Sequence, residues 1–289
     1  MEGETAKKLT TRDNAVISYR ILRGKEPRRL LVLLHGMASN LTRWSEFVET
    51  TVLRDSWDLL RLDLRGHAGS LWRGPVSMEI WCDDLAEVLD AEGYDDAIVA
   101  GHCLGANLAL NFASRHPLRT AGLVLVEPMP RQSLTGTLRK FQPIKPLVFI
   151  AIRIIRLLNG LGLQRKSIPV LDLHALDRET RAAVAEQGSP DAMLRRYAVP
   201  WHDLRFMPSA NYLQEFLEVS RALPRLSGIT VPVLALLSSG TFLNDPERTR
   251  RVLYALPDLE VLLLDAHHWI PTERPKEMRE AIEQWCLAL

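Results

Sequence analysis

The chain has 289 residues, and its 36 basic and 35 acidic side chains leave a formal net charge of +1. It has neither the basic field that would indicate a nucleic-acid partner nor the acidic field that would indicate a polycation. The length allows a sizeable buried core, but it fits one large α/β domain as well as two ordinary domains. The composition therefore gives no reason to expect a nucleic-acid partner, and it does not indicate any other partner.

The N-terminal residues and the cysteines bear on the cellular compartment. The first 14 residues lack the apolar core of a signal peptide, and no apolar run reaches the roughly 18–20 residues that a membrane span requires. The three cysteines, Cys82, Cys103 and Cys286, are an odd number and form no CxxC pair. We therefore expect a cytoplasmic protein with three free thiols and no metal site built on cysteine.

Apolar runs and helical periodicity alternate along the first part of the chain. Alternating or continuous apolar residues predict strands, and apolar residues at helical spacing predict helices between them. The strands are expected over 15–22, 30–34, 59–64, 97–100 and 121–126, and the helices over 77–92 and 104–115. Strands that alternate with amphipathic helices form right-handed crossovers on a mostly parallel sheet. The sequence therefore predicts an α/β fold with a mostly parallel central sheet flanked by helices.

This alternation stops after residue 127 and resumes about 100 residues later. Strands are expected again over 231–238 and 261–264, followed by a closing helix over 276–289. The intervening residues are too many for a loop in a compact domain, where loops are usually shorter than about 15 residues. We predict that residues 1–127 and 228–289 form one core, and that residues 128–227 form a mainly helical lid inserted into it.

A short glycine motif separates the strand expected over 97–100 from the helix expected over 104–115. Residues 101–105 read Gly-His-Cys-Leu-Gly. In a strand-to-helix elbow of this kind the central residue takes a strained backbone conformation, and side chains two positions away would collide, so glycine is required there. The central side chain projects from the carboxyl end of the sheet above the positive end of a helix, which suits a thiolate. Cys103 is therefore the candidate nucleophile, and a small buried hydrophobe is the less favoured alternative.

Five segments together resemble the α/β-hydrolase family along nearly the whole chain. Residues 101–105 are similar to its nucleophile elbow. Residues 33–37, Leu-Leu-His-Gly-Met, resemble its oxyanion segment, and residues 63–67, Asp-Leu-Arg-Gly-His, resemble the turn after its next strand. Residues 266–269, Ala-His-His-Trp, and 273–275, Glu-Arg-Pro, resemble its catalytic-histidine loop. The segments occur in the family's order, so the resemblance implies an α/β-hydrolase fold with an inserted helical lid.

The resemblance also implies roles for individual residues. The oxyanion hole would consist of the backbone N–H groups of Met37 and Leu104, which act through the main chain and so tolerate any side chain. The catalytic base would be His268, which directly precedes the aromatic residue of the loop, rather than its neighbour His267. Three further histidines match positions that are structural in the family: His35, His67 and His102.

The nucleophile position departs from most of the family, which carries serine there. A few members, among them dienelactone hydrolases and polyhydroxyalkanoate synthases, resemble this chain in using cysteine. A thiol is more nucleophilic than a hydroxyl group, and its acyl product is a thioester that transfers the acyl group to water, amines or thiols. The resemblance therefore implies covalent acyl chemistry on Cys103.

Two carboxylates compete for the acidic position of the triad. In most of the family an Asp follows the penultimate strand, but residues 239–241 are Ser, Gly and Thr. Some members carry the acid after the strand that follows the elbow helix, and Glu127 occupies that position. The base needs an acceptor for its far nitrogen, and a carboxylate that ends an apolar strand is costly unless it is paired. We therefore favour Glu127 over Asp245, whose alternative role is to cap a helix.

Apolar residues of the predicted lid give an indication of the kind of substrate. Residues 146–158 are apolar nearly all round apart from Arg153 and Arg156. Such a helix packs in a core, lines a pocket for an acyl chain, or lies on a bilayer with its arginines at the headgroups. We favour core packing over a pocket wall, and a pocket wall over membrane contact. Five lid residues are candidates for lining the same pocket: Trp201, Phe206, Met207, Tyr212 and Phe216.

These residues predict a hydrolase. Cys103 attacks the ester or thioester of a lipophilic acyl group, and His268, oriented by Glu127, transfers the proton. Two alternatives stay open: acyl transfer, including cyclising or condensing reactions, from the same acyl-cysteine to an alcohol, amine or thiol, and a ligand-binding protein without turnover. The acyl substrate is a small molecule, either free or carried by CoA or an acyl carrier protein. The sequence has no metal site, phosphate loop or nucleotide motif, so no cofactor is expected.

Overall fold

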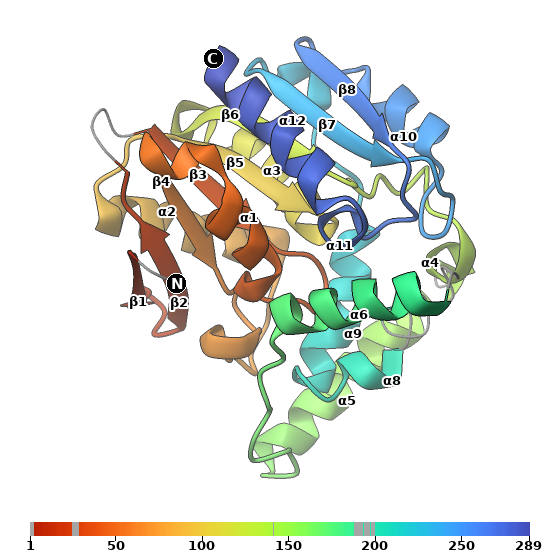
Figure 1. The fold of residues 1–289 in the computed structure, drawn as a ribbon. Helices are drawn as coiled ribbons and strands as arrows, with labels where there is room; N and C mark the ends of the chain where they lie inside the picture. The colour runs from red at the N-terminus through yellow and green to blue at the C-terminus, as the bar shows by residue number, and fades with distance from the viewer. Residues whose placement is uncertain (1–2, 25–28, 141, 188–192, 194–196, 198–199) are drawn as a thin grey trace.

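The computed structural model describes residues 3–24, 29–140, 142–187, 193, 197 and 200–289. A twisted sheet runs through the molecule, and helices cover both of its faces (Figure 1). The strands are β1 Glu4–Thr10, β2 Val16–Leu22, β3 Arg29–Leu34, β4 Trp57–Leu62, β5 Ala97–His102, β6 Thr120–Val126, β7 Val233–Ser238 and β8 Leu259–Leu264. Their order in the sheet is β1-β2-β4-β3-β5-β6-β7-β8. β2 pairs antiparallel with both β1 and β4, and the remaining neighbours are parallel.

The α-helices fall into two groups. Those that flank the sheet are α1 Ser45–Thr50, α2 Met78–Glu92, α3 Leu104–Arg115, α10 Pro246–Leu253, α11 Ile270–Glu273 and α12 Pro275–Ala288. Those between β6 and β7 are α4 Gly136–Lys140, α5 Lys145–Gly160, α6 Leu173–Gln187, α8 Pro200–Asp203 and α9 Ser209–Val219. Short 3-10 helices lie at Leu41–Trp44, Val52–Asp55, Ala68–Ser70, Pro117–Arg119, Gln142–Ile144 and Leu226–Gly228.

The central strands are apolar on both faces because both faces are covered. In β3, Leu30, Val32 and Leu34 belong to the core that α2 and α3 share with the sheet, whereas Leu31 and Leu33 belong to the core on the side of α1 and α12. Successive side chains of a strand point to opposite faces. A strand buried on both faces therefore appears in the sequence as a continuous apolar run.

The predicted fold class is confirmed, with one addition at the edge of the sheet. β1 was not expected, and it pairs with β2 from Glu4 opposite Leu22 to Thr10 opposite Val16. As an edge strand it keeps polar and partly exposed side chains along its length. It therefore lacks the apolar run by which the other strands are recognised.

Residues 128–227, here called the insertion, leave the sheet after β6 and return to it before β7. Its helices lie at the carboxyl ends of the parallel strands (Figure 1). The expectation that residues 146–158 pack in the core is wrong. α5 is buried only through Val148 and Ile152, which pack against Ala210 of α9. The opposite side of α5 is exposed because α9 covers only one side of it.

Candidate active site

The predicted elbow forms a tight turn between β5 and α3, with Cys103 at its apex. Cys103 has a φ of 55°, which is uncommon for a residue with a side chain. A Cβ atom on Gly101 would lie 2.1 Å from the carbonyl oxygen of Gly105, and one on Gly105 would lie 2.6 Å from that of His35. The turn therefore requires glycine at both positions. The N–H of Cys103 donates to the carbonyl oxygen of Val126 at 2.9 Å, which ties the turn to β6.

His268 lies in the loop between β8 and α11, and only 2% of its surface is exposed. Its Nδ1–H donates to Oε2 of Glu127 at 3.0 Å. Burial lowers the pKa of His268, but the hydrogen bonds with Cys103 and Glu127 outweigh this effect and raise the pKa to about 10. The imidazole is therefore protonated at neutral pH, and it lies between the sulfur of Cys103 and the carboxylate of Glu127.

Glu127 follows β6 directly and has a φ of 51°. One carboxylate oxygen accepts the hydrogen bond from His268, and the other accepts from the N–H of Ser238 at the end of β7. Asp245, the alternative acid, accepts instead from the N–H of Arg248 and caps α10. The geometry therefore places Glu127, and not Asp245, beside His268.

Glu273 shapes the loop that carries the two adjacent histidines. Its carboxylate accepts hydrogen bonds from the N–H groups of His267, His268 and Trp269 at 2.9 to 3.1 Å. It also accepts from the side chain of His267 at 2.8 Å. The imidazole of His267 is thus paired with Glu273, while that of His268 faces Glu127. The sequence placed Glu273 in the loop motif but did not indicate that it binds three consecutive main-chain N–H groups.

The two residues predicted to form the oxyanion hole flank the nucleophile. Gly36 packs directly on Cys103, since a Cβ atom on Gly36 would lie 3.2 Å from that of Cys103. Met37, the next residue, lines the cavity described below. Leu104 is the first residue of α3 and is completely buried.

Glu215 of α9 holds the residue that follows Met37. The N–H of Ala38, which has a φ of 50°, donates to Oε2 of Glu215 at 3.0 Å. Nε2 of His67 lies 2.6 Å from Oε1 of the same carboxylate. Burial lowers the pKa of His67, but the charge of Glu215 outweighs it and raises the pKa. The sequence does not single out Glu215, because its only signal is an acidic residue on the same helical face as Tyr212 and Val219.

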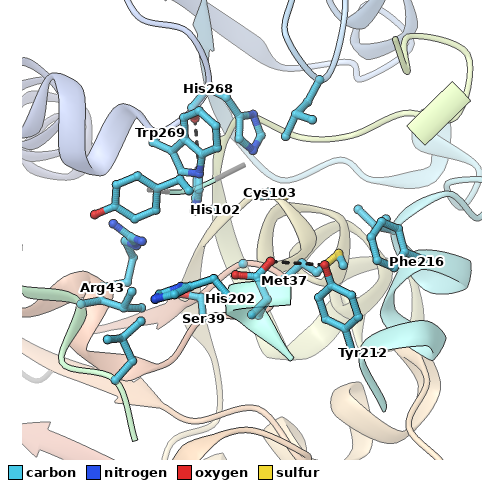
Figure 2. Close-up of a pocket in the computed structure, with 18 of the residues that line it drawn as sticks. Met37, Ser39, Arg43, His102, Cys103, His202, Tyr212, Phe216, His268 and Trp269 are labelled. Carbon is cyan, nitrogen blue, oxygen red and sulfur yellow. Dashed lines mark hydrogen bonds between the residues drawn. The ribbon is translucent and has the colours of Figure 1, made fainter. Parts of the chain in front are cut away.

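A cavity of about 190 Å³ lies between the elbow and the insertion (Figure 2). Cys103 and His268 form part of its wall, and Tyr212 and Phe216 line it as the sequence suggested. Three predicted lining residues lie elsewhere in the described chain: Trp201, Phe206 and Met207. The apolar part of the wall consists of Met37, Leu138, Leu171, Leu173, Leu176, Phe216, Val219, Phe242, Leu243 and Trp269. The cavity is therefore suited to an apolar group held beside the thiol.

Polar groups on the wall interrupt this apolar lining. The hydroxyl group of Tyr212 donates to the carboxylate of Asp203 at 3.3 Å, as the dashed line at Tyr212 shows in Figure 2. Burial raises the pKa of Asp203 to about 7, so the group is about half ionised at neutral pH. Ser39 also lines the cavity, and its buried Oγ has no hydrogen-bond partner among the described residues. These groups can bind a polar part of a ligand.

A buried ion pair joins the core to the insertion next to the cavity. Arg43 donates to both oxygens of Asp177 at 2.5 and 2.7 Å, and to Oγ1 of Thr272 at 2.6 Å. The hydroxyl group of Tyr197 also donates to Asp177. Arg43 and Asp177 are 134 positions apart in the chain, and neither belongs to a motif, so the sequence did not indicate that they meet.

His35 and His102 have structural surroundings. His35 donates from Nδ1 to the carbonyl oxygen of Gly36 at 2.8 Å and accepts at Nε2 from the N–H of Leu64 at 3.0 Å. His102 donates from Nε2 to the carbonyl oxygen of His268 at 3.3 Å. Burial lowers the pKa of both imidazoles well below the usual value, so both are neutral. Among the described residues, no group of three or more His, Cys, Asp or Glu side chains is arranged to hold a metal ion.

Residues 29–275 match the profile of the alpha/beta hydrolase fold family, and the chain therefore belongs to this family. It is similar to the pimeloyl-[acyl-carrier protein] methyl ester esterase of Aromatoleum aromaticum, with 40% identity over 100 residues, which are 35% of this chain and 37% of that protein. It is also similar to Lipase LipV of Mycobacterium tuberculosis, with 26% identity over 233 residues, or 76% of this chain and 80% of that protein. The chain thus spans little more than a third of the first relative.

Solved structures share the fold along nearly the whole chain. The enol-lactonase from Burkholderia xenovorans LB400 has a TM-score of 0.71 and 19% identity, covering 97% of this chain and 100% of that one. A hydrolase from Pseudomonas aeruginosa PA01 has a TM-score of 0.69 and 20% identity, covering 98% of each chain. At this level of identity the likeness shows the fold alone.

Proposed function

We propose that this chain hydrolyses the ester or thioester of a lipophilic acyl group, with Cys103 as the nucleophile, His268 as the proton carrier and Glu127 as the orienting acid. The observation that carries this proposal is the buried imidazole of His268, which is hydrogen-bonded to Glu127 and to the thiol at the apex of the elbow. The esterase and the lipase among the relatives support the choice of ester substrates.

In the first half-reaction the thiolate of Cys103, paired with protonated His268, attacks the carbonyl carbon. The oxyanion of the tetrahedral intermediate accepts hydrogen bonds from the N–H groups of Met37 and Leu104. Collapse breaks the bond to the alcohol or thiol, which leaves with the proton from Nε2 of His268. The products are an acyl-cysteine thioester and a neutral imidazole that still donates from Nδ1 to Glu127.

In the second half-reaction the neutral His268 takes a proton from a water molecule, whose oxygen adds to the thioester carbon. Collapse of this second intermediate breaks the carbon–sulfur bond and releases the carboxylic acid. Cys103 is left as a thiolate beside protonated His268, which is the starting state. Glu127 accepts from Nδ1 throughout and stabilises the positive charge whenever the imidazole carries it.

The cavity sets the expected size of the acyl group. A cavity of about 150 Å³ holds benzene, and this one measures about 190 Å³, so it fits an acyl chain of roughly six to eight carbon atoms. We propose that the insertion is the lid that encloses this chain. The Aromatoleum relative is named for an ester bound to an acyl carrier protein, which supports carrier-bound acyl groups as candidate substrates.

Acyl transfer is the second candidate function. The largely apolar wall around Cys103 limits the access of water to a thioester. An alcohol, amine or thiol that enters the cavity would then compete for the acyl group. The first half-reaction is the same in both candidates, so the fate of the acyl-cysteine distinguishes them.

The test follows intact mass and product release when wild type, Cys103→Ala and Cys286→Ala are incubated with acyl esters and acyl thioesters. Cys286 is a buried thiol outside the cavity, so its variant is the matched control. We expect an acyl adduct on wild type and on Cys286→Ala but not on Cys103→Ala. Decay of the adduct in water supports hydrolysis, and decay only after an acceptor is added supports transfer. If no variant gains mass or releases product, the binding-protein alternative replaces both.

A further inference from the structure

One side of α5 is an exposed apolar surface. Leu147, Ile150, Ile154 and Leu157 are between 53% and 67% exposed. Their spacing of three or four residues places them on one face of the helix. This face lies opposite the residues that pack on α9. It is therefore apolar without any covering element in the described chain.

The apolar surface continues into the turn that follows α5. Leu161 and Leu163 are 70% and 67% exposed. Of the 21 large apolar side chains that are exposed in the described residues, ten lie between Ile144 and Val170. Single exposed apolar residues are ordinary, but a contiguous set on one helix marks a binding surface. We call the surface formed by residues 144–163 the α5 face.

The segment that carries the α5 face is strongly basic. Residues 128–171 contain eight Lys and Arg residues and no Asp or Glu, whereas the rest of the chain has 28 basic and 35 acidic residues. The net charge of +1 is therefore the sum of a positive segment and a negatively charged remainder of the protein. Arg139, Lys140, Arg153 and Lys166 of this segment are exposed, and in the chain they come before, within and after the exposed apolar residues.

We infer that the α5 face is a docking surface for an anionic lipid bilayer. An amphipathic helix with exposed leucine and isoleucine residues and flanking cations lies in the plane of a membrane interface, where lipid tails cover its apolar side and anionic headgroups pair with its basic residues. No helix in the described residues is long and apolar enough to cross a bilayer. In Figure 1, α5 lies at the end of the insertion farthest from the sheet, which leaves it open to a flat surface.

A second copy of the chain fits this surface less well. In a two-fold dimer the same patch faces itself, so the cations of one α5 face would lie opposite those of the other and repel them. A bilayer with anionic lipids supplies both the apolar layer and the opposite charge. The inference does not depend on the chemistry of Cys103, because it rests only on exposure and charge in the insertion.

The cavity wall and the basic segment share one element, α4. α4 contributes Leu138 to the cavity wall, and the two residues that follow, Arg139 and Lys140, are exposed cations of the basic segment. The 3-10 helix Gln142–Ile144 contacts both α4 and α5, so the α5 face and one part of the cavity wall belong to adjoining elements.

Vesicle flotation of the full chain tests this inference. The vesicles contain either phosphatidylcholine alone or phosphatidylcholine with about one third phosphatidylglycerol. The test variant is Ile150→Asp/Ile154→Asp, and the matched control is Leu118→Asp/Leu287→Asp, which adds the same charge at two exposed leucines elsewhere. Thermal unfolding of each variant verifies that it is folded.

We expect wild type and the control to float with the anionic vesicles, and the test variant to bind them at least about tenfold more weakly. Binding should also weaken in high salt and with neutral vesicles. The inference is overturned if folded wild type does not float, or if the test variant floats equally well. It is also overturned if wild type is a dimer that Ile150→Asp/Ile154→Asp converts to a monomer while vesicles bind neither form.

Discussion

The side chain of Glu127 extends from β6 to the end of β7. This position determines that Glu127 is the carboxylate that pairs with His268. It follows β6, but its carboxylate lies at the end of β7, where one oxygen accepts a hydrogen bond from the N–H of Ser238. The other oxygen is left for His268. In the proposed triad the carboxylate thus comes from the residue after β6, but it occupies the place at the end of β7 where most of the family has an Asp.

Replacing Glu127 by Gln tests its role with little change in shape. The amide cannot stabilise a protonated imidazole, so we expect kcat to fall about 100- to 10,000-fold. Asp245→Asn makes the same change at the alternative acid, and Asn caps a helix as well as Asp, so its kcat should stay near wild type. Steady-state kinetics of the two variants decide between the carboxylates, and a larger loss in Asp245→Asn would exclude Glu127.

The pH dependence of the reaction should follow His268. Its pKa of about 10 means that the proton for the leaving group is available up to about pH 10 and is lost above it. Activity should therefore persist into alkaline solution and fall through that pH. In Glu127→Gln one of the two hydrogen bonds that raise the pKa is weakened, so the alkaline limb should move to lower pH. Rate profiles of both proteins check this shift, and coincident limbs would contradict it.

Asp203 carries a second pH dependence, this time of stability. Its pKa is about 7 in the folded chain and 3.8 without burial. The folded state therefore binds the proton more tightly, and the resulting stabilisation is complete below pH 3.8 and is lost as the pH rises through 7. Asp203→Asn lacks this titration, so its stability relative to wild type should increase over that range by roughly 1–2 kcal/mol. Urea unfolding at several pH values measures the difference, and a constant difference would contradict the assignment.

At the scale of elements, α9 of the insertion supports the segment of the core that we propose to form the oxyanion hole. Glu215 binds the N–H of Ala38, and its charge is balanced by His67. The N–H groups of the proposed oxyanion hole must already point at the position of the oxyanion before the reaction begins. They stabilise the transition state because no reorganisation is then needed. Glu215 is therefore a positioning residue, and it acts on the substrate only through the segment that it holds.

Glu215→Gln keeps the acceptor for Ala38 but removes the charge beside His67, whereas Glu215→Ala removes both. We expect kcat to fall about tenfold in the first variant and about 100-fold in the second, with KM nearly unchanged. Glu215→Ala should also lower the free energy of unfolding by about 3 kcal/mol, because the charge of buried His67 is left without its counter-ion. Glu218→Gln on the same helix is the control. A loss confined to KM would show that Glu215 contacts the substrate instead.

What the sequence predicted at this scale depended on local signals. The elbow, the histidine loop and Glu127 are each defined by a few consecutive residues, so they could be placed before the fold was known. Arg43 and Asp177, by contrast, meet only when α6 packs on the core, and periodicity carries no information about such long-range packing. For the same reason the sequence favours core packing of residues 146–158 over an exposed side, since a helix that is apolar nearly all round does not reveal how many neighbours cover it.

At the scale of the whole molecule, two buried ion pairs among the described residues connect the core to the insertion. Arg43 with Asp177 lies on one side of the cavity, and His67 with Glu215 connects α9 to the core. Breaking a buried ion pair is expensive because each charge is left without its partner or its water. The insertion should therefore stay closed over Cys103, and substrates should enter at its edges rather than through a wide opening.

Asp177→Asn tests this anchoring. Arg43 would lose its paired charge, so we expect faster amide hydrogen exchange in α6 than in wild type, while α2 on the far side of the sheet is unchanged. Esters with bulky acyl groups should gain in relative kcat/KM, because the lid opens more easily. Hydrogen-exchange mass spectrometry measures the first effect, and equal exchange in α6 would show that the ion pair does not hold the insertion.

The position of Glu127 on β6 has a consequence for how this enzyme scaffold can be altered. The loop after β7 carries no proposed catalytic group, yet Phe242 and Leu243 within it line the cavity. A library of variants randomised over this loop would therefore change the shape of the site while leaving nucleophile, base and acid in place. Because the proposed nucleophile, base and acid lie outside this loop, laboratory evolution can vary this part of the cavity wall without replacing them.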